Sequence, residues 1–272
     1  MYYQIRGTEK KDLEERKLFE KIVYPLNPGK DVYNSDFHNV YIAFLTSRVS
    51  KDERLDGKKT TVRDCGGVDL QVFKGFNLER VLARYESHVD GYTYPNTQSD
   101  EHSPRHFPID SIAVYVSLNL RNTEKATNEM LVEVLKRTLH KEDVGKKCDI
   151  RRYLMTNAVR GWNLIDMDVP PEKDLLLLKS ILDEYLEEFF VIQTKAGYHW
   201  IFHNQMVSKA RPDQSLHVVL KKYIKEGQLQ SIDFGSTGMI NNNGFTVVPG
   251  TFQRGHKVSF ARDLCKGLDK YI

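Results

Sequence analysis

The sequence has few cysteines, and they lie far apart. Cys65, Cys148 and Cys265 are the three cysteines among 272 residues, and they form no C-x-x-C pair of the kind that zinc sites use. This pattern argues against a structural zinc centre and against a disulfide framework. We expect free thiols in a reducing, cytoplasmic environment.

Long apolar runs are also missing. No stretch approaches the roughly 20 apolar residues that a membrane-spanning helix requires. The sequence is polar and charged from Gly7 onward, unlike an export signal. We therefore expect a soluble protein without a membrane partner. The motif G-x-x-x-x-G-K-[ST] does not occur, which argues against a fused helicase.

Charge of neither sign dominates. There are 40 basic and 37 acidic residues, so the formal net charge is only +3. Contact with DNA or RNA would have to come from local patches. The densest basic patch consists of Lys146, Lys147, Arg151, Arg152 and Arg160. A solvated helix surface and a contact with primer or template phosphates are both open readings of it.

The sequence does contain an acidic segment inside an apolar stretch, WNLIDMD at 162–168. Side chains alternate along a strand, so Asp166 and Asp168 share one face while Ile165 and Met167 share the other. Two carboxylates on one face repel each other unless a cation offsets them. Mg²⁺ or Mn²⁺ suits these oxygen ligands. The alternative is a pair of carboxylates that caps a strand in solvent.

A helix is expected at 172–189, followed by a hairpin in FFVIQTKAGYHWIFH. The tip of this hairpin contains Lys195 and Gly197, and its second arm contains His199. A histidine in a strand is more often a structural residue than a functional one. That alternative therefore stays open for His199.

A third acidic position lies nearer the end of the sequence, where Asp233 stands in a short apolar strand. If this strand lies beside the one with Asp166 and Asp168, three carboxylates converge on a possible two-metal site. Arg254 and Lys257 would bring positive charge for a triphosphate. The alternative for Asp233 is an ion pair with a lysine or arginine on a neighbouring strand.

The remaining patterns predict a chain of mixed α and β structure. Helices are expected at 9–23, 78–85, 123–140 and 216–224, and strands at 40–45, 68–73 and 112–120. Turn-forming residues dominate 88–108, which suggests an N-terminal α/β lobe at 1–105 and a core at 106–272. The predicted fold class is α+β, with a helix-backed sheet.

Taken in order, three stretches resemble the archaeo-eukaryotic primase superfamily, in particular its primase-polymerase (prim-pol) branch of plasmids, phages and mobile elements. LIDMD is similar to the family's hydrophobic-Asp-hydrophobic-Asp strand, and GYH to its small-x-His motif on a hairpin. SIDFG, followed by TVVPGTFQRG, is similar to its hydrophobic-Asp strand and Pro-containing turn. The resemblance covers roughly 110–262 and implies an RRM-like palm sheet.

The resemblance implies that Asp166, Asp168 and Asp233 bind two catalytic Mg²⁺ or Mn²⁺ ions. It also implies that the motif of Gly197 and His199 contacts the phosphates of the incoming nucleotide. The expected activity is that of a metal-dependent nucleotidyltransferase, a DNA primase or DNA polymerase that acts in DNA replication. Its expected partners are nucleoside triphosphates, a single-stranded or primed DNA template, and a separate helicase.

Charge and position add Lys195, Arg254 and Lys257 to the expected nucleotide-binding residues. Two other functions remain open. One is a non-catalytic nucleic-acid-binding accessory protein of replication that keeps the same sheet. The other is a rolling-circle nicking endonuclease, but its His-hydrophobic-His motif is missing because His199 and His203 stand four positions apart.

Overall fold

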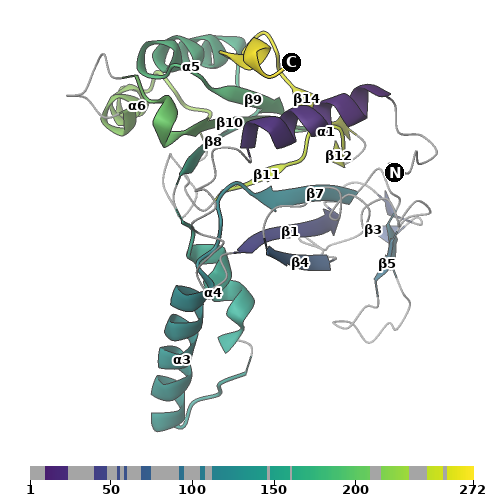
Figure 1. Ribbon diagram of the computed structural model, residues 1–272, viewed down its shortest axis with the longest axis vertical. Coiled ribbons are helices and arrows are strands. Elements are labelled where there is room, and N and C mark those ends of the chain that lie inside the picture. The colour runs from purple at the N-terminus through teal and green to yellow at the C-terminus, as the bar shows by residue number, and fades with distance from the viewer. Residues whose placement is uncertain are drawn as a thin grey trace.

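Figure 1 shows the computed structural model of the chain. The structure describes residues 10–23, 40–47, 54–55, 58–59, 69–74, 92–94, 105–107, 112–145, 148–159, 161–208, 216–232, 244–253 and 256–272. The helix expected at 78–85 and the candidate residues Asp233 and Arg254 lie outside the described residues. The described part combines helices with antiparallel sheets, which confirms the α+β class.

The first sheet has the strand order β11-β7-β1-β4. Strand β1 (Val40–Ser47) pairs on one side with β4 (Asp69–Lys74) and on the other with β7 (Ile112–Ser117). Strand β11 (Phe245–Val247) pairs with the outer side of β7. All these pairs are antiparallel. Strands from distant parts of the sequence therefore share one sheet.

The second sheet has the order β14-β9-β10-β8 and is also antiparallel. It consists of β8 (Trp162–Asp168), β9 (Phe190–Gln193), β10 (Gly197–His203) and β14 (Ser259–Phe260). The expected hairpin is confirmed as β9 and β10, and the backbone N–H of Thr194 closes its tip on the carbonyl of Gly197 at 2.9 Å.

Three short two-stranded pairs and two 3-10 helices complete the elements of the described residues. They are β2 (Arg54–Leu55) with β3 (Lys58–Lys59), β5 (Tyr92–Tyr94) with β6 (Arg105–Phe107), β12 (Phe252–Gln253) with β13 (His256–Lys257), η4 (Asn204–Met206) and η5 (Leu268–Lys270).

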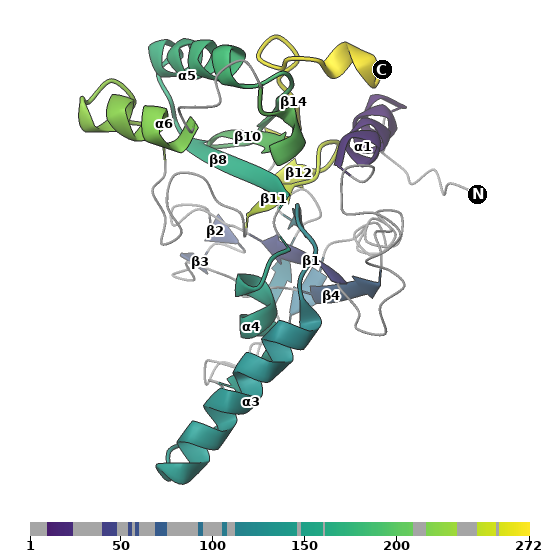
Figure 2. The same cartoon turned by 60° about the vertical axis from the view of Figure 1, so that its left-hand side comes forward.

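Helices α5 (Glu172–Tyr185) and α6 (Leu216–Lys225) lie on the side of the second sheet that faces away from the first (Figures 1 and 2). The expected end of the first of these helices at 189 is wrong. Leu186 is already extended, and Phe189 pairs with Lys266 as part of the sheet edge. Phe189 is buried as part of the sheet and not as part of the helix. A buried apolar residue gives the same signal in the sequence in either case.

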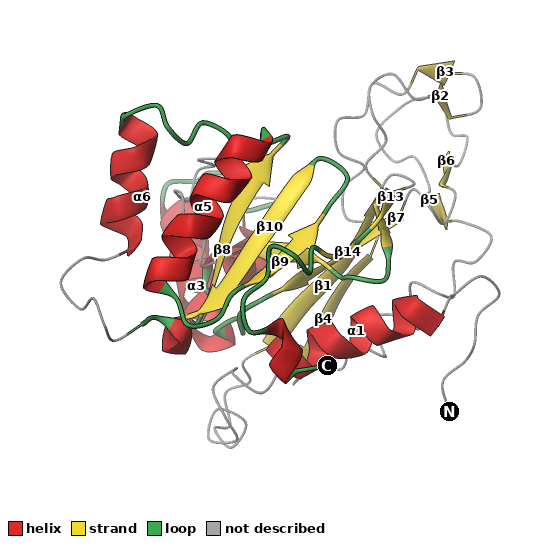
Figure 3. Cartoon of the chain, turned by 90° about the horizontal axis from the view of Figure 1, so that it is seen from above, coloured by secondary structure: helices red, strands yellow, loops and turns green. Residues whose placement is uncertain are grey.

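Helix α1 (Lys10–Val23) runs beside β14 and β12 in Figure 1, and Figure 3 shows the C-terminus next to it. Its buried apolar face includes Phe19 and Ile22. The indole N–H of Trp162 donates to the carbonyl of Val23 at 3.1 Å. Helix α1 is therefore fixed to the start of β8.

Helix α3 (Thr123–Leu139) projects from the body, with α4 (Ile150–Thr156) packed on its base (Figure 2). Asn122 caps it, because its side-chain oxygen accepts from the N–H of Lys125 at 2.8 Å. Helix α4 falls in a segment for which the sequence patterns predicted neither a helix nor a strand.

One core cluster joins residues of both sheets with residues of the helices α1, α5 and α6. Trp162 and Trp200 are fully buried, and Leu178 and Leu182 of α5 belong to the same cluster. Among the residues that the structure describes, no helix combines the length and the apolar character needed to cross a membrane.

Candidate functional site

The register of β8 and β10 brings two separate motifs together. His199 lies directly opposite Asp166, and Gly197 lies opposite Asp168. Directly opposite residues of an antiparallel pair project to the same side of the sheet. Asp166, Asp168 and His199 therefore share one face, although some thirty residues separate the acids from the histidine in sequence.

The two acids and the histidine differ in exposure. The side chain of Asp166 is 41% exposed, whereas that of His199 is only 9% exposed. Asp168 is exposed at the end of the strand. The His199 Nε2 atom lies 3.6 Å from the Asp166 Oδ1 atom. The imidazole thus forms the floor of the site, and the carboxylates remain within reach of solvent.

The other ring nitrogen of His199 is held from the first sheet. Its Nδ1 atom lies 2.9 Å from the Oγ1 atom of Thr246, which is fully buried on β11. This contact spans the two sheets and fixes the ring so that Nε2 points toward Asp166. The sequence patterns marked this apolar strand but not Thr246, because a threonine in a strand carries no signal of its own.

Gly197 permits the close approach of the two strands. A Cβ atom at this position would lie 1.7 Å from the carbonyl oxygen of Met167, which is backbone and cannot move aside. A glycine at the start of β10 is therefore a steric requirement. The hydroxyl of Thr194 lies 3.1 Å from the Gly197 carbonyl and further orders this tip.

The acidic strand ends in strained backbone. Val169, directly after Asp168, has a φ of 42°, and β-branched residues rarely adopt this left-handed conformation. Such a conformation costs about 1 to 2 kcal/mol and persists where surrounding contacts enforce it. Here the N–H of Val169 donates to the carbonyl of Ala196 at 2.6 Å, which ties the end of β8 to the hairpin tip.

A further segment lies against the free edge of β8. The N–H of Asp168 donates to the carbonyl of Ser231 at 3.0 Å, and Ile232 forms an antiparallel bridge with Met167. The chain therefore reaches the acidic strand one residue before Asp233. Asp233 itself lies outside the described residues.

Asp174 fastens this segment to the first turn of α5. Its carboxylate accepts hydrogen bonds from the Ser231 hydroxyl at 2.7 Å and from the N–H groups of Ser231 and Gln230. Burial by itself would raise the pKa of Asp174, but these hydrogen bonds outweigh burial and hold the pKa below its ordinary value. The sequence patterns missed this role, since acids are common in the first turn of any helix.

The expected phosphate-binding residues come from neighbouring turns. The backbone N–H of Lys195 donates to the Gln253 side chain at 3.0 Å, so the tip of the β9–β10 hairpin touches the β12–β13 hairpin. The Lys195 side chain is exposed. The Nζ atom of Lys257 lies 2.7 Å from Asp12 of α1. Arg254 is not among the described residues.

A buried cation lies behind β11. The guanidinium of Arg121 is fully buried and sits 4.7 Å from the ring centroid of Phe245, the residue before Thr246. Burial lowers the pKa of Arg121 to about 10, so it stays charged at neutral pH. The sequence patterns placed Arg121 after a strand and gave it no role.

The donor atoms at this face suit a hard divalent cation, because both acids offer carboxylate oxygens on an accessible surface. Within the described ranges, however, no group of three or more His, Cys, Asp or Glu side chains is arranged to hold a metal ion. A third carboxylate would have to come from a residue outside those ranges. Asp233 is the candidate, since Ile232 already lies beside β8.

Comparisons of this chain with protein-family models, with curated proteins and with solved structures found no match.

Proposed function

We propose that the chain is a metal-dependent nucleotidyltransferase of the primase-polymerase type. The observation that carries this proposal is the β8–β10 register, which sets His199 opposite Asp166 and Gly197 opposite Asp168. Two motifs that suggested one site in the sequence thereby share one face of one sheet. The bridge between Ile232 and Met167 adds support, because it brings the chain to that sheet edge next to the third motif.

In this function, Asp166, Asp168 and Asp233 would hold Mg²⁺ or Mn²⁺. These ions, when bound, activate a 3′-hydroxyl and neutralise the charge that develops on the leaving pyrophosphate. The contribution of the protein is to position charged groups. His199 would present Nε2 to the triphosphate, with its ring held by Thr246. Lys195, Arg254 and Lys257 would add positive charge, and Lys257 would then have to exchange its contact with Asp12.

Primer extension tests the proposal. The wild-type protein should add labelled dNTPs or NTPs to a primed DNA template in the presence of Mg²⁺ or Mn²⁺. Asp166→Asn and Asp168→Asn should each lower incorporation by about 100-fold or more, because each removes a charge that stabilises the transition state. Asp269→Asn is the matched control, since Asp269 is an exposed carboxylate in η5.

Thermal unfolding with and without Mn²⁺ separates a loss of metal binding from a loss of folding. Both site variants should unfold at or above the wild-type temperature without metal, because one of two repelling charges is gone. They should lose the stabilisation that Mn²⁺ gives the wild type. Full incorporation by either variant would overturn the proposal. DNA binding by a wild type that incorporates nothing would favour the accessory binding protein.

Variants of His199 and Thr246 test the nucleotide contact. His199→Ala should raise the KM for nucleotide by about 10-fold to 150-fold, the equivalent of one charge-assisted hydrogen bond. Thr246→Val should raise it by a smaller factor, whereas Thr246→Ser keeps the hydroxyl and should restore the wild-type KM. Equal effects of Thr246→Val and Thr246→Ser on the KM would mean that Thr246 acts by packing and does not orient the His199 ring.

A further inference from the structure

Helix α3 is amphipathic, but its apolar side is exposed and its charged side is partly buried. Its exposed side carries four large apolar residues: Leu131 at 49% exposure, Val132 at 50%, Leu135 at 62% and Leu139 at 80%. Leu131, Leu135 and Leu139 follow each other at intervals of four and form one row along the helix. We call these four residues the α3 stripe. All four side chains are exposed.

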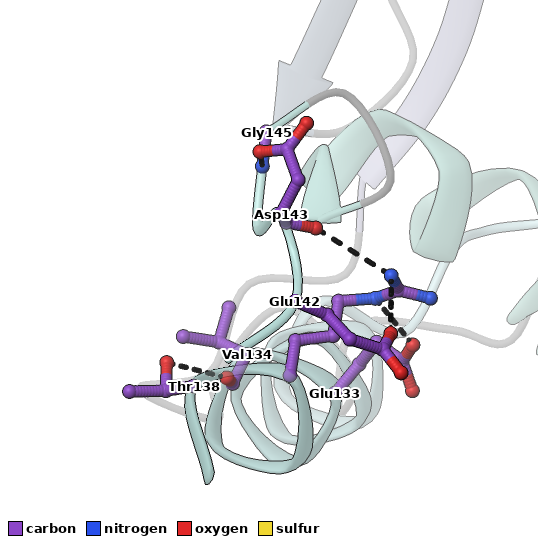
Figure 4. Close-up of polar contacts among 7 residues, drawn as sticks. Glu133, Val134, Thr138, Glu142, Asp143 and Gly145 are labelled. Carbon is purple, nitrogen blue, oxygen red and sulfur yellow. Dashed lines mark hydrogen bonds and ion pairs between the residues drawn. The ribbon is translucent and has the colours of Figure 1, made fainter. Parts of the chain in front are cut away.

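The opposite side of α3 contacts the segment that follows the helix and is polar at its outer end. There Glu133 and Arg137 form an ion pair at 2.7 Å, and their side chains are only 33% and 17% exposed. Figure 4 shows this cluster, in which Arg137 also bonds to Glu142 at 3.0 Å. Charged groups are thus more buried than the leucines on the other side. Packing against the residues that the structure describes does not explain the α3 stripe.

We propose that the α3 stripe is a self-association surface, through which two copies of the chain pair their α3 helices antiparallel. A helix face with anchors at regular intervals of four fits another helix better than it fits a flat surface. Helix α3 projects from the body (Figure 2), and the side chains of the stripe are exposed along it. The stripe also complements itself in shape, because one row of leucines can interdigitate with the same row in reverse.

Charge complementarity selects a second copy and sets its direction. Lys125, Glu129, Val132 and Lys136 form a second row along one flank of the stripe. A two-fold axis at the level of residue 133 places Leu131 opposite Leu135 of the second copy. It also places Glu129 within one residue, about 1.5 Å along the axis, of Lys136 of the second copy. Parallel pairing about a two-fold axis would instead set this flank against the opposite flank of the second copy, so the contacts between Glu129 and Lys136 would be lost.

The size of the stripe limits the strength of the dimer. Four apolar side chains per copy form a smaller contact than the roughly 800 Å² per partner of a stable interface. The dimer should therefore be weak, with a dissociation constant of about 10 μM to 1 mM. A closed two-fold pair uses the same patch on both copies, so association stops at two.

Sedimentation velocity over a concentration range of about 1 μM to 1 mM tests the proposal. The wild type should pass from monomer to dimer, and Leu135→Glu should weaken this association at least tenfold. Leu176→Glu is the matched control, because Leu176 is a 55% exposed leucine on another helix, α5. A monomeric wild type, growth beyond the dimer, or equal association of Leu135→Glu would each overturn the proposal.

A charge exchange tests the direction of pairing. Lys136→Glu and Glu129→Lys should each associate more weakly than the wild type, because each opposes like charges across the dimer. An equimolar mixture of the two should associate again as a heterodimer, since both flank contacts then join opposite charges. Circular dichroism checks that Glu129→Lys is folded, because Glu129 also accepts a hydrogen bond from Asn157 at 2.6 Å. A mixture that associates as weakly as each variant alone would rule out the antiparallel pair.

Discussion

Gly197 is the single residue on which the geometry of the β8–β10 pair depends most. Gly197→Ala would place a methyl group 1.7 Å from the Met167 carbonyl oxygen, so the strands must separate at the acidic end. We expect the free energy of unfolding to fall by about 3 kcal/mol. Urea unfolding measures this change.

Gly145→Ala is the control for that substitution. Its added methyl group would meet only the side chain of Asp143, which is exposed and can turn away. We expect a change below about 1 kcal/mol. The loss of glycine flexibility in the unfolded chain by itself favours folding, so it cannot account for a loss of stability. A change at Gly197 as small as that at Gly145 would show that the strands accept the methyl group and that their close approach does not require glycine.

His203 makes the stability of the protein depend on pH. The ring is buried edge-on against Trp162, with 5.3 Å between ring centroids, and burial lowers the pKa of His203 from its ordinary value of 6.5. The unfolded chain thus binds this proton at a higher pH than the native state does. The free energy of unfolding should therefore decline as the pH falls below about 6.5.

His203→Gln cannot take up this proton, so its stability should decline less steeply than that of the wild type between about pH 6.5 and pH 5. Urea unfolding at a series of pH values gives both curves. His217→Gln, on the exposed side of α6, should follow the wild type. Parallel curves for wild type and His203→Gln would assign the pH dependence to other groups.

At the scale of elements, the C-terminus of α3 ends in a capping motif that lacks its preferred residue. The N–H of Glu142 donates to the carbonyl of Arg137 at 2.8 Å, and that of Lys141 to Thr138 at 3.1 Å. This pattern places Lys141 in the left-handed conformation, with a φ of 55°, where glycine is favoured. Lys141→Gly should raise the free energy of unfolding by about 1 kcal/mol.

Thermal or urea unfolding of Lys141→Gly, compared with that of Lys136→Gly, measures this change. Lys136 lies inside the same helix, where glycine should instead lower stability by about 1 kcal/mol. The two lysine-to-glycine changes should therefore have opposite signs. A loss of stability in both would mean that the left-handed residue is not strained.

Most of the helices and strands could be predicted from periodicity. The elements expected at 9–23, 123–140 and 216–224 occur as α1, α3 and α6, because one apolar face repeats clearly in each. Helix α4 was missed because its seven residues are too few to show a repeat. The end of α5 was predicted four residues beyond Tyr185, where the helix ends. The reason is that Phe189 is apolar and buried in the sheet, and an apolar residue of the helix would look the same in the sequence.

The site could be predicted in part, by its local motifs. Alternation alone put Asp166 and Asp168 on one face, and this holds in β8. The pairing of His199 with Asp166 depends on strand register, and no local pattern fixes a register across some thirty residues. The contact with Thr246 depends on how two sheets pack, so it could not be read from the sequence.

At the scale of the whole molecule, α1 is joined to the far end of the sequence. Glu15 is 2% exposed and accepts the N–H of Phe260 at 2.8 Å, and it forms an ion pair with Arg262 at 2.6 Å. Glu15→Gln should lower the free energy of unfolding by about 2 kcal/mol, because it removes the charge from a buried carboxylate that accepts two hydrogen bonds.

Glu14→Gln is the neighbouring control. The Glu14 side chain is 60% exposed, and its ion pair with Lys10 is long, at 3.9 Å. The loss of its charge should therefore change the free energy of unfolding by less than about 0.5 kcal/mol. Urea unfolding compares both variants with the wild type. A Glu15 variant as stable as the Glu14 variant would mean that apolar packing alone holds α1 in place.

The attachment of α1 also sets an order of events during synthesis. Its partners Gly250 and Phe260 lie 234 and 245 positions later in the sequence than Arg16 and Glu15. At translation rates of about 5 to 20 residues per second, α1 waits some 10 to 50 s on the ribosome before those partners exist. The contact with β8 becomes available earlier, since Trp162 lies 139 positions after Val23. The complete docking of α1 therefore waits for the C-terminal segment, and we expect it to be among the last steps of folding.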